Sequence, residues 1–258
     1  MKRIIYILLL LAAPFCMAAQ DNGTTTAAAY TKAMGDSAYS AANYEKAIET
    51  YEAIIADEGS SLQLYYNLGN AYFRNNMIGK SILNYERALR IDPTDDDTKA
   101  NLEFAQSRMK DELAEQYEIF FVTWFKAIVN LLGITAWAVL GVVAFVILLL
   151  TALVVLFNKN NRIRKISLSI AIVSLFVTIF ANISAYNLSS AMQDNSHAII
   201  MKEEVSLKST PNNSGTVLIK VHEGRKVRIT DDTMSDWKEI GLEDGTVGWV
   251  PSSALERI

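Results

Sequence analysis

The sequence contains a single cysteine, Cys16, which lies in an apolar stretch near the N-terminus. One cysteine cannot form an internal disulfide, and it provides no thiolate cluster for zinc. The two histidines, His197 and His222, are also too few for a zinc site without further ligands, and none is evident. The folded parts of the chain must therefore be stabilised by packing alone, and we expect no metal and no other cofactor.

Basic residues are scarce in the parts of the chain that are polar. Between Gln20 and Tyr117 there are 9 basic and 16 acidic residues, and between Asp194 and Ile258 there are 8 and 11. Neither part has the basic face of a nucleic-acid-binding protein, and acidic surfaces are expected to avoid anionic lipids. The sequence also lacks a glycine-rich phosphate loop, a nucleophile elbow and a paired-acid motif. We therefore predict that the protein is not an enzyme.

Charge is absent altogether from two long stretches. No charged residue occurs between Lys126 and Lys159, and none occurs from Ile166 to Tyr186. The apolar runs 131–157 and 166–186 are long enough to cross a hydrocarbon core, which takes about 20 residues. Two such runs only eight residues apart do not fit the alternative of a buried core helix. We therefore predict two transmembrane helices, 131–157 and 166–186.

The segment between these helices indicates their orientation. Residues 158–165, NKNNRIRK, contain four basic residues and no acid, which is typical of a cytoplasmic loop. The spans contain no ionisable side chain, which argues against a transporter or a proton pump. The aromatic segment 117–130 before the first span has two interpretations, a helix lying in the membrane interface or an extension of the first span.

The N-terminus has the pattern of a secretory signal peptide. Lys2 and Arg3 precede an apolar stretch, and small residues follow near Ala18 and Ala19. We predict a signal peptide at 1–19, although Cys16 could instead become the lipidated first residue of a lipoprotein. With the basic turn in the cytoplasm, the prediction is a multi-pass protein of the bacterial inner membrane whose N- and C-terminal domains are both periplasmic.

A 34-residue repeat occupies the region between the signal peptide and the first span. Residues that recur at this interval are Gly35 and Gly69, Lys46 and Lys80, Ile48 and Ile82, Tyr51 and Tyr85, and Glu52 and Glu86. This period is typical of a helix–turn–helix repeat. Residues 27–115 resemble the tetratricopeptide repeat (TPR) family, with a capping helix that begins near Asp96. Because about three units are needed for stability, we expect the membrane segment or another subunit to complete the core.

The resemblance to TPR proteins implies a concave groove lined by the first helix of each repeat. The candidate partner-binding residues at these positions are Lys32, Tyr39, Tyr66, Asn70 and Phe73. Some family members bind a C-terminal carboxylate with a clamp of Lys and Asn residues. Here Asp36 and Asp97 stand where an Asn and a Lys are needed, and they would repel a carboxylate. We therefore exclude that type of clamp.

The pattern changes to period-two alternation after the second span. Short alternating segments separated by turn residues predict a small all-β barrel. Residues 197–258 resemble the bacterial SH3-like family through VSL at 205–207, EG at 223–224 and GWVP at 248–251. Trp249 has two interpretations. It fills or covers the barrel, or it flanks a shallow peptide or glycan groove together with Trp237.

The order of these segments resembles the BatE-type proteins of the Bacteroides aerotolerance (Bat) family, and the motifs YYNLGNAYF and DGTVGWVPSSALE contribute to the resemblance. The resemblance implies partners among von Willebrand A-domain membrane proteins and a MoxR-type ATPase system, in aerotolerance or envelope stress. We predict a non-catalytic inner-membrane adaptor or scaffold that binds protein partners on the periplasmic side. The alternative is a component of the envelope that binds peptidoglycan through its SH3-like domain. A signalling receptor fits least, because only about eight residues would be cytoplasmic.

Overall fold

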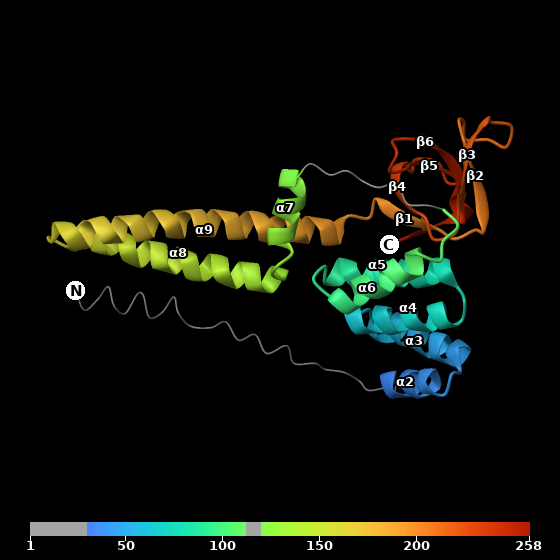
Figure 1. The fold of residues 1–258 in the computed structure, drawn as a ribbon, viewed down its shortest axis with the longest axis horizontal. Coiled ribbons are helices and arrows are strands. Elements are labelled where there is room, and N and C mark those ends of the chain that lie inside the picture. The colour runs from blue at the N-terminus through green and yellow to red at the C-terminus, as the bar shows by residue number, and fades with distance from the viewer. Residues whose placement is uncertain (1–29, 112–119) are drawn as a thin grey trace.

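The computed structural model describes residues 30–111 and 120–258. The predicted signal peptide, Cys16 included, lies outside the described residues, as do the first residues of the predicted repeat region and of the segment 117–130. The described chain comprises a helical repeat region, a long apolar helical hairpin and a C-terminal antiparallel sheet (Figure 1). This architecture agrees with the multi-domain class expected from the sequence, with helical repeats, two apolar helices and an all-β part.

The repeat region consists of helices packed in antiparallel pairs. They are α2 (Lys32–Ser40), α3 (Tyr44–Glu58), α4 (Leu62–Arg74), α5 (Ile78–Ile91) and α6 (Asp96–Gln106). Four of these helices begin with a side chain that accepts a hydrogen bond from a backbone N–H of the first turn, and these N-cap residues are Thr31, Asn43, Ser61 and Asp95. Such caps satisfy backbone donors that have no partner within the helix. The helix boundaries are therefore set largely by local sequence.

Each repeat packs a tyrosine against a glycine of its first helix. An added Cβ at Gly35 would lie 2.4 Å from the ring of Tyr51, and one at Gly69 would lie 2.7 Å from the ring of Tyr85. Real Cβ atoms do not come this close, so each glycine allows the two helices of its pair to approach. Both tyrosines are almost fully buried as a result. The same Gly–Tyr pair recurs 34 residues later, which explains the period seen in the sequence.

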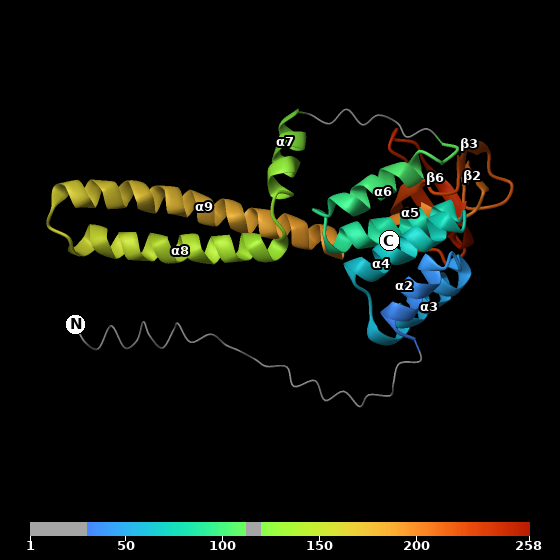
Figure 2. The same ribbon diagram turned by 60° about the horizontal axis from the view of Figure 1, so that its bottom comes forward.

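The apolar hairpin consists of α8 (Ile134–Phe157) and α9 (Asn161–Gln193), which run side by side in both views (Figures 1 and 2). Small residues predominate where the two helices meet, and those that are buried are Gly141, Ala144, Ser167, Ala171, Ser174, Ala181 and Ser184. Small side chains let helix backbones approach closely in membranes. The outward faces carry many exposed Val, Leu, Ile and Phe side chains. Both helices are long and apolar enough to cross a membrane.

The turn of the hairpin is shorter than the segment 158–165 taken from the sequence. The side chain of Asn160 accepts a hydrogen bond from the Arg162 N–H at 3.0 Å, and α9 begins at Asn161. This cap extends the helix toward the turn, so that Arg162, Arg164 and Lys165 lie on the first turns of α9. The cations remain at the end of the hairpin that is remote from the two folded domains (Figure 1).

Helix α7 (Phe120–Val129) is separated from α8 by a bend at 130–133. It lies across the hairpin, near the end that faces the folded domains, in both views (Figures 1 and 2). The indole N–H of Trp137 donates to the Val129 carbonyl at 2.8 Å, and the Trp137 ring packs on Phe180 with centroids 5.5 Å apart. These contacts hold the bend, and α7 is therefore a separate helix and not a continuation of the first span.

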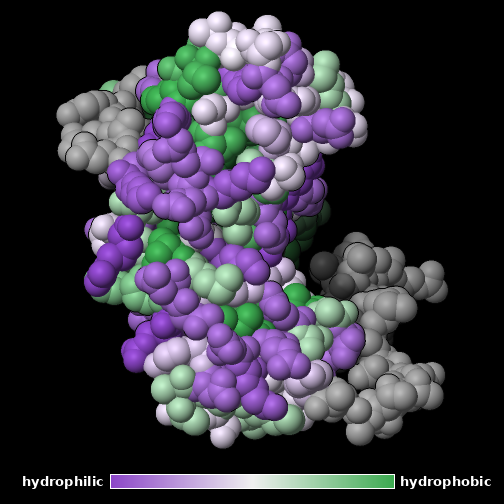
Figure 3. Space-filling view, turned by 90° about the vertical axis from the view of Figure 1, so that its right-hand side faces the viewer, coloured by the Kyte–Doolittle hydropathy of each residue, from purple (hydrophilic) through white to green (hydrophobic). Residues whose placement is uncertain are grey.

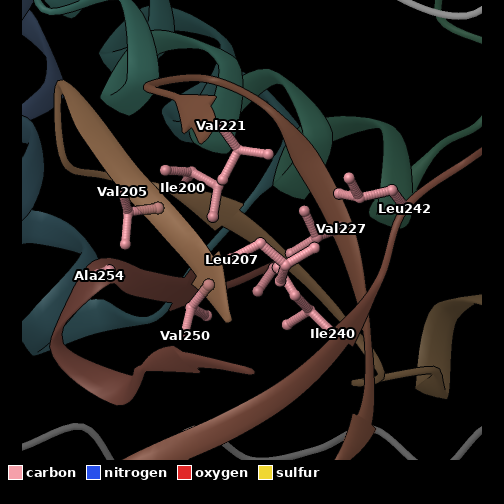
Figure 4. Close-up of a cluster of buried hydrophobic side chains, with 10 residues drawn as sticks. Ile200, Val205, Leu207, Val221, Val227, Ile240, Leu242, Val250 and Ala254 are labelled. Atoms are coloured by element: carbon pink, nitrogen blue, oxygen red, sulfur yellow. The ribbon is translucent and has the colours of Figure 1, made fainter. Parts of the chain in front are cut away.

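The C-terminal domain is an antiparallel sheet with the strand order β3-β2-β6-β5-β4-β1-β7. The strands are β1 (His197–Ile200), β2 (Glu204–Lys208), β3 (Val217–His222), β4 (Lys226–Asp231), β5 (Trp237–Gly241), β6 (Val247–Pro251) and β7 (Leu255–Arg257). One face buries a core in which Leu207, Val227, Ile240 and Val250 point toward one another (Figure 4).

The expected closed barrel is not seen, because β3 and β7 stand at opposite ends of the sheet order and the sheet is open. The physical reason lies at the β1–β7 end. There, Ile199 and Ile258 turn away from the core of the sheet and are buried against α5 and α6. Covering this end with helices removes the need to close the sheet on itself.

Candidate functional site

The sheet and the last repeat share one apolar core. Ile199 is fully buried and Ile258 is nearly so, in a cluster with Ile82, Tyr85 and Leu102 of α5 and α6. Figure 1 shows α5 between the sheet and the rest of the repeat region. The open face of the last repeat is therefore covered by the C-terminal domain as well as by α6. The sequence led us to expect the membrane segment or another subunit in this place, whereas the structure shows that the C-terminal sheet covers this face.

The turn between β3 and β4 reaches the N-terminus of α5. The Gly79 N–H donates to Glu223 Oε1 at 2.9 Å, at a helix end where Met77 provides no side-chain cap. A carboxylate is favourable there because it meets the positive end of the helix dipole. An added Cβ at Gly79 would lie 2.5 Å from Glu223 Cγ, so the glycine permits the contact. Beside it, the His222 N–H donates to Asp111 Oδ2 at 2.9 Å.

Ion pairs fix the other side of this junction. Lys226 Nζ lies 2.7 Å from Glu86 Oε2, and the Glu86 side chain is only 10% exposed. Arg87 donates to Glu256 at 3.1 Å, and Arg90 donates to the Ile258 carbonyl at 2.5 Å. A nearly buried carboxylate needs such a partner, because an unpaired one would be costly. The junction is thus specified by charge as well as by shape.

Two signals for this junction are present in the sequence, although the junction is not among the features predicted from it above. Residues Ala198 to Met201 are apolar at consecutive positions, which is typical of a strand buried on both faces and not of an alternating one. Gly79 also departs from the repeat, because its counterpart 34 residues earlier is Glu45. A glycine inside a helix often marks the close approach of another chain segment.

The concave side of the repeats contains a polar cavity of about 320 Å³. Its walls come from α2, α3 and α4, and the lining residues are Lys32, Asp36, Tyr39, Ser40, Tyr51, Gln63, Asn67 and Asn70. The structure therefore brings together Lys32, Tyr39 and Asn70 from the predicted groove set. Tyr66 and Phe73 lie outside this cavity, toward α6.

The positions of Tyr66 and Phe73 are explained by α6. The Tyr66 hydroxyl accepts a hydrogen bond from Asn101 at 3.1 Å, and Phe73 packs against Phe104 with ring centroids 5.3 Å apart. Asn70 has a similar role, because its Oδ1 accepts from the Tyr85 hydroxyl at 2.6 Å. These side chains join α4 to the helices that follow it. Lys32 and Tyr39 are the predicted residues that line the cavity from α2.

Asp36 is the centre of a hydrogen-bond network in the cavity. Its carboxylate accepts from Lys32 Nζ at 2.7 Å, from the Tyr51 hydroxyl at 2.7 Å and from Asn67 Nδ2 at 3.1 Å. Burial alone would raise the pKa of Asp36, but these hydrogen bonds and the charge of Lys32 outweigh it and hold the pKa below its usual value. The positive charge of Lys32 is therefore already neutralised. This arrangement gives a second reason to exclude a carboxylate clamp.

We expect the Asp36→Asn variant to be less stable than the wild type at neutral pH and equally stable at low pH. A carboxyl group with a depressed pKa contributes stability above its unfolded pKa, which is about 3.9 for Asp. That contribution is lost as the pH falls through the lower pKa of the folded state. The measurement is the difference in thermal midpoint between the two proteins at pH 7 and below pH 3. The exposed residue Asp57 supplies the control, and an Asp57→Asn variant with the same pH-dependent difference would contradict this role of Asp36.

Trp237 and Trp249 lie on the outer face of the sheet. Trp237 pairs with Pro251 and Trp249 pairs with Glu239, which places the two rings diagonally on one face, whereas Ile240 and Val250 point to the core on the other face. Lys208 is opposite Trp249 and its Nζ lies 5.7 Å from the centroid of the Trp237 ring. Trp249 therefore does not fill the interior of the domain.

Two segments of the chain match known protein families. Residues 63–95 match the tetratricopeptide repeat, and residues 203–256 match the bacterial SH3 domain. A search of curated proteins finds no match. Domains of these two kinds are typically non-catalytic: TPR repeats indicate protein interaction, and bacterial SH3 domains indicate a role at the cell wall. The chain therefore carries a TPR repeat and a bacterial SH3 domain on either side of an apolar helical hairpin.

Proposed function

We propose that this protein is a non-catalytic adaptor of the bacterial inner membrane that holds a protein partner in the groove of its repeats. The observation that carries the proposal is that two binding domains share one core at the same end of an apolar hairpin. A hairpin that crosses a membrane returns the chain to the side from which it started. Both domains then face the same compartment and act as one rigid unit.

The distribution of apolar surface supports insertion of the hairpin. The outward faces of α8 and α9 are covered with exposed aliphatic and aromatic side chains, whereas the face of the folded domains turned away from the hairpin is mostly hydrophilic (Figure 3). A soluble protein rarely exposes an apolar surface this large. The cations of Arg162, Arg164 and Lys165 at the tip favour a cytoplasmic turn. Periplasmic placement of both folded domains follows from this orientation.

The proposed partners are other envelope proteins. The resemblance to the Bat family points to von Willebrand A-domain membrane proteins and a MoxR-type ATPase system in aerotolerance or envelope stress. The polar lining of the repeat cavity favours a hydrogen-bonding segment of a partner over an apolar helix. Because Lys32 is paired with Asp36, the segment would be recognised by its polar groups and not by a terminal carboxylate.

We expect the Ser40→Trp variant to recover about ten-fold less of the specific partner from detergent extracts. Ser40 is exposed and lines the cavity, so an indole at this position would fill it without disturbing the packed core. The measurement is affinity capture of the full chain followed by quantification of the partner. Deletion of the repeats is a poor test, because it would expose Ile199 and Ile258 and thereby destabilise the remaining domain as well.

The matched control is Glu45→Trp, which introduces the same ring at an exposed position of α3 outside the cavity. Glu45→Trp should recover as much partner as the wild type. Equal recovery with Ser40→Trp and the wild type would rule out the groove as the binding site. Failure of the wild type to recover any specific protein would argue against the adaptor itself.

The alternative function is binding of peptidoglycan through the C-terminal domain. The observation in its favour is the pair of outward-facing tryptophans beside Lys208. Aromatic faces commonly stack on sugar rings, and the N–H of a tryptophan ring donates hydrogen bonds to neighbouring polar groups. Sedimentation of the full chain with purified peptidoglycan discriminates the two functions. Loss of sedimentation in Trp249→Ala, with no change in Ser40→Trp, would favour the cell-wall function.

A further inference from the structure

The short segment that follows α6, residues 107–111, lies against the turn between β3 and β4, and we call it the strap. Met109 of the strap packs on the core that the last repeat shares with the sheet, and its Sδ lies 2.9 Å from the position of a Cβ added at Gly224. Asp111 binds His222 with both of its carboxylate oxygens, at 2.9 Å from the backbone nitrogen and at 2.5 Å from Nδ1. The strap thus joins the end of α6 to the sheet at two points.

The imidazole ring of His222 has a carboxylate at each of its two nitrogens. Nδ1 lies 2.5 Å from Asp111 Oδ1, and Nε2 lies 3.5 Å from Glu204 Oε2. A neutral imidazole carries a proton on one nitrogen only, so the lone pair of the other nitrogen would face a carboxylate oxygen. The side chains of His222 and Asp111 are only 23% and 15% exposed, so solvent screens this pair little. The geometry therefore fits the protonated ring, which donates at both nitrogens.

The other charged groups near the ring have partners of their own. Besides Asp111 and Glu204, the charged side chains next to the ring and its two partners are Lys110, Glu203, Lys220 and Glu223. Lys110 donates to Glu203 at 2.9 Å and lowers the pKa of that carboxyl group. Lys220 lies 2.7 Å from Glu204 and lowers its pKa in the same way. Glu223 is turned toward the start of α5, where it accepts a backbone hydrogen bond. Glu203 and Glu204 therefore keep their charge between about pH 5 and 8, the range in which histidine ordinarily titrates.

We infer that His222 is a pH-sensitive latch, which holds the strap against the sheet while the ring is protonated and loosens it when the proton is lost. At low pH both nitrogens donate, one to each carboxylate. As the pH rises, the ring loses its charge, one nitrogen no longer donates, and the two carboxylates are left without a cation between them. A looser strap uncovers Met109 and the shared core, so the repeats and the sheet form a less rigid unit at higher pH. The latch is independent of membrane insertion and of a partner in the groove.

Hydrogen exchange of the full chain in a neutral detergent, at about pH 5 and about pH 8, tests the latch. The His222 N–H donates to Asp111, so the protection factor of this amide, corrected for the pH dependence of intrinsic exchange, reports how often the strap is bound. We expect the protection factor to be about five-fold lower at the higher pH, the order by which a hydrogen bond between charged groups exceeds one made by a neutral donor.

Three variants separate the charge of the ring from its shape. His222→Gln keeps an N–H donor toward Asp111 but cannot be protonated, so the amide at this position should have the lower protection at both pH values. His222→Arg carries its charge at both pH values and should keep the higher protection throughout. The control is His197→Gln, which removes the histidine of β1 and should leave the pH difference of the wild type unchanged.

Three results would overturn the inference. They are equal protection of the wild type at the two pH values, a pH difference that persists in His222→Gln, and loss of the difference in His197→Gln, which would assign the response to the other histidine. Thermal unfolding verifies that each variant is folded. If His222→Gln is not, His222→Arg decides by itself, because a fall in its protection at the higher pH contradicts the latch. Partner capture is a separate measurement, so failure of the latch leaves the adaptor proposal intact, and the reverse also holds.

Discussion

Replacing Ile199 with alanine is expected to destabilise the repeat region and the C-terminal domain together. Ile199 belongs to the sheet by sequence but is fully buried against α5 and α6. Truncating a buried isoleucine to alanine costs about 2–5 kcal/mol, through lost burial and through the cavity that remains. Because the cavity lies between two domains, both lose part of their support. The expected result is a lower thermal midpoint of the full chain in detergent.

Hydrogen exchange distinguishes coupled domains from independent ones. In Ile199→Ala, amides of α5 and α6 should lose protection along with those of β1, because local opening of one side uncovers the other. Ile219→Ala is the control, since Ile219 lies on β3 and is 41% exposed. It should leave α5 and α6 unaffected. Unchanged protection of α5 and α6 in Ile199→Ala would show that the two domains are stable independently.

Replacing Gly69 with alanine is expected to destabilise the second repeat, although alanine is the better helix former. In an exposed helix, a change from glycine to alanine increases the stability of the helix by about 0.5–1 kcal/mol. Here the new methyl group would lie 2.7 Å from the ring of Tyr85, which is only 2% exposed and cannot move without repacking. Overpacking of this kind costs about 1–3 kcal/mol. The measurement is the thermal midpoint, which should fall and not rise.

A second substitution tests the reason for that loss. Leucine at position 85 removes the ring that meets the new methyl group, so the double variant Gly69→Ala, Tyr85→Leu should lose less stability than the sum of the two single changes. Gly133→Ala serves as the control, because nothing lies within 4 Å of an added Cβ there. Strict additivity in the double variant would mean that the glycine is required for a reason other than the approach of Tyr85.

The helical repeats and the two apolar helices could be predicted from sequence because each depends on a short-range pattern. Period-34 recurrence follows from the Gly–Tyr contact within each repeat, and the apolar helices follow from uninterrupted runs. The strands were also predicted, but the closed barrel was not found. Closure of the barrel depends on what covers the β1–β7 end of the sheet. The helix that covers it, α5, lies more than a hundred residues before β1 in the sequence.

The predicted groove residues also show, one residue at a time, what depends on sequence spacing and what depends on packing. Counting along the repeat placed Lys32, Tyr39 and Asn70 on the cavity, but it could not show that Tyr66 and Phe73 contact α6 instead. The difference comes from Asn101 and Phe104, whose positions relative to α4 are set by how α6 packs. The bend at 130–133 is of the same kind, because it is held by Trp137 packing on a helix that comes later in the chain.

The sequence by itself determined which segments are repeats, apolar helices and strands, since these follow from residue spacing, turn residues and charge gaps. Only the tertiary structure decided that the sheet completes the core of the last repeat, that Glu223 binds the start of α5, and that Lys226 pairs with Glu86. The physical reason is that such contacts depend on complementary shape and charge between surfaces far apart in the chain. Complementarity of this kind produces no repeating sequence pattern in either of the two segments that meet.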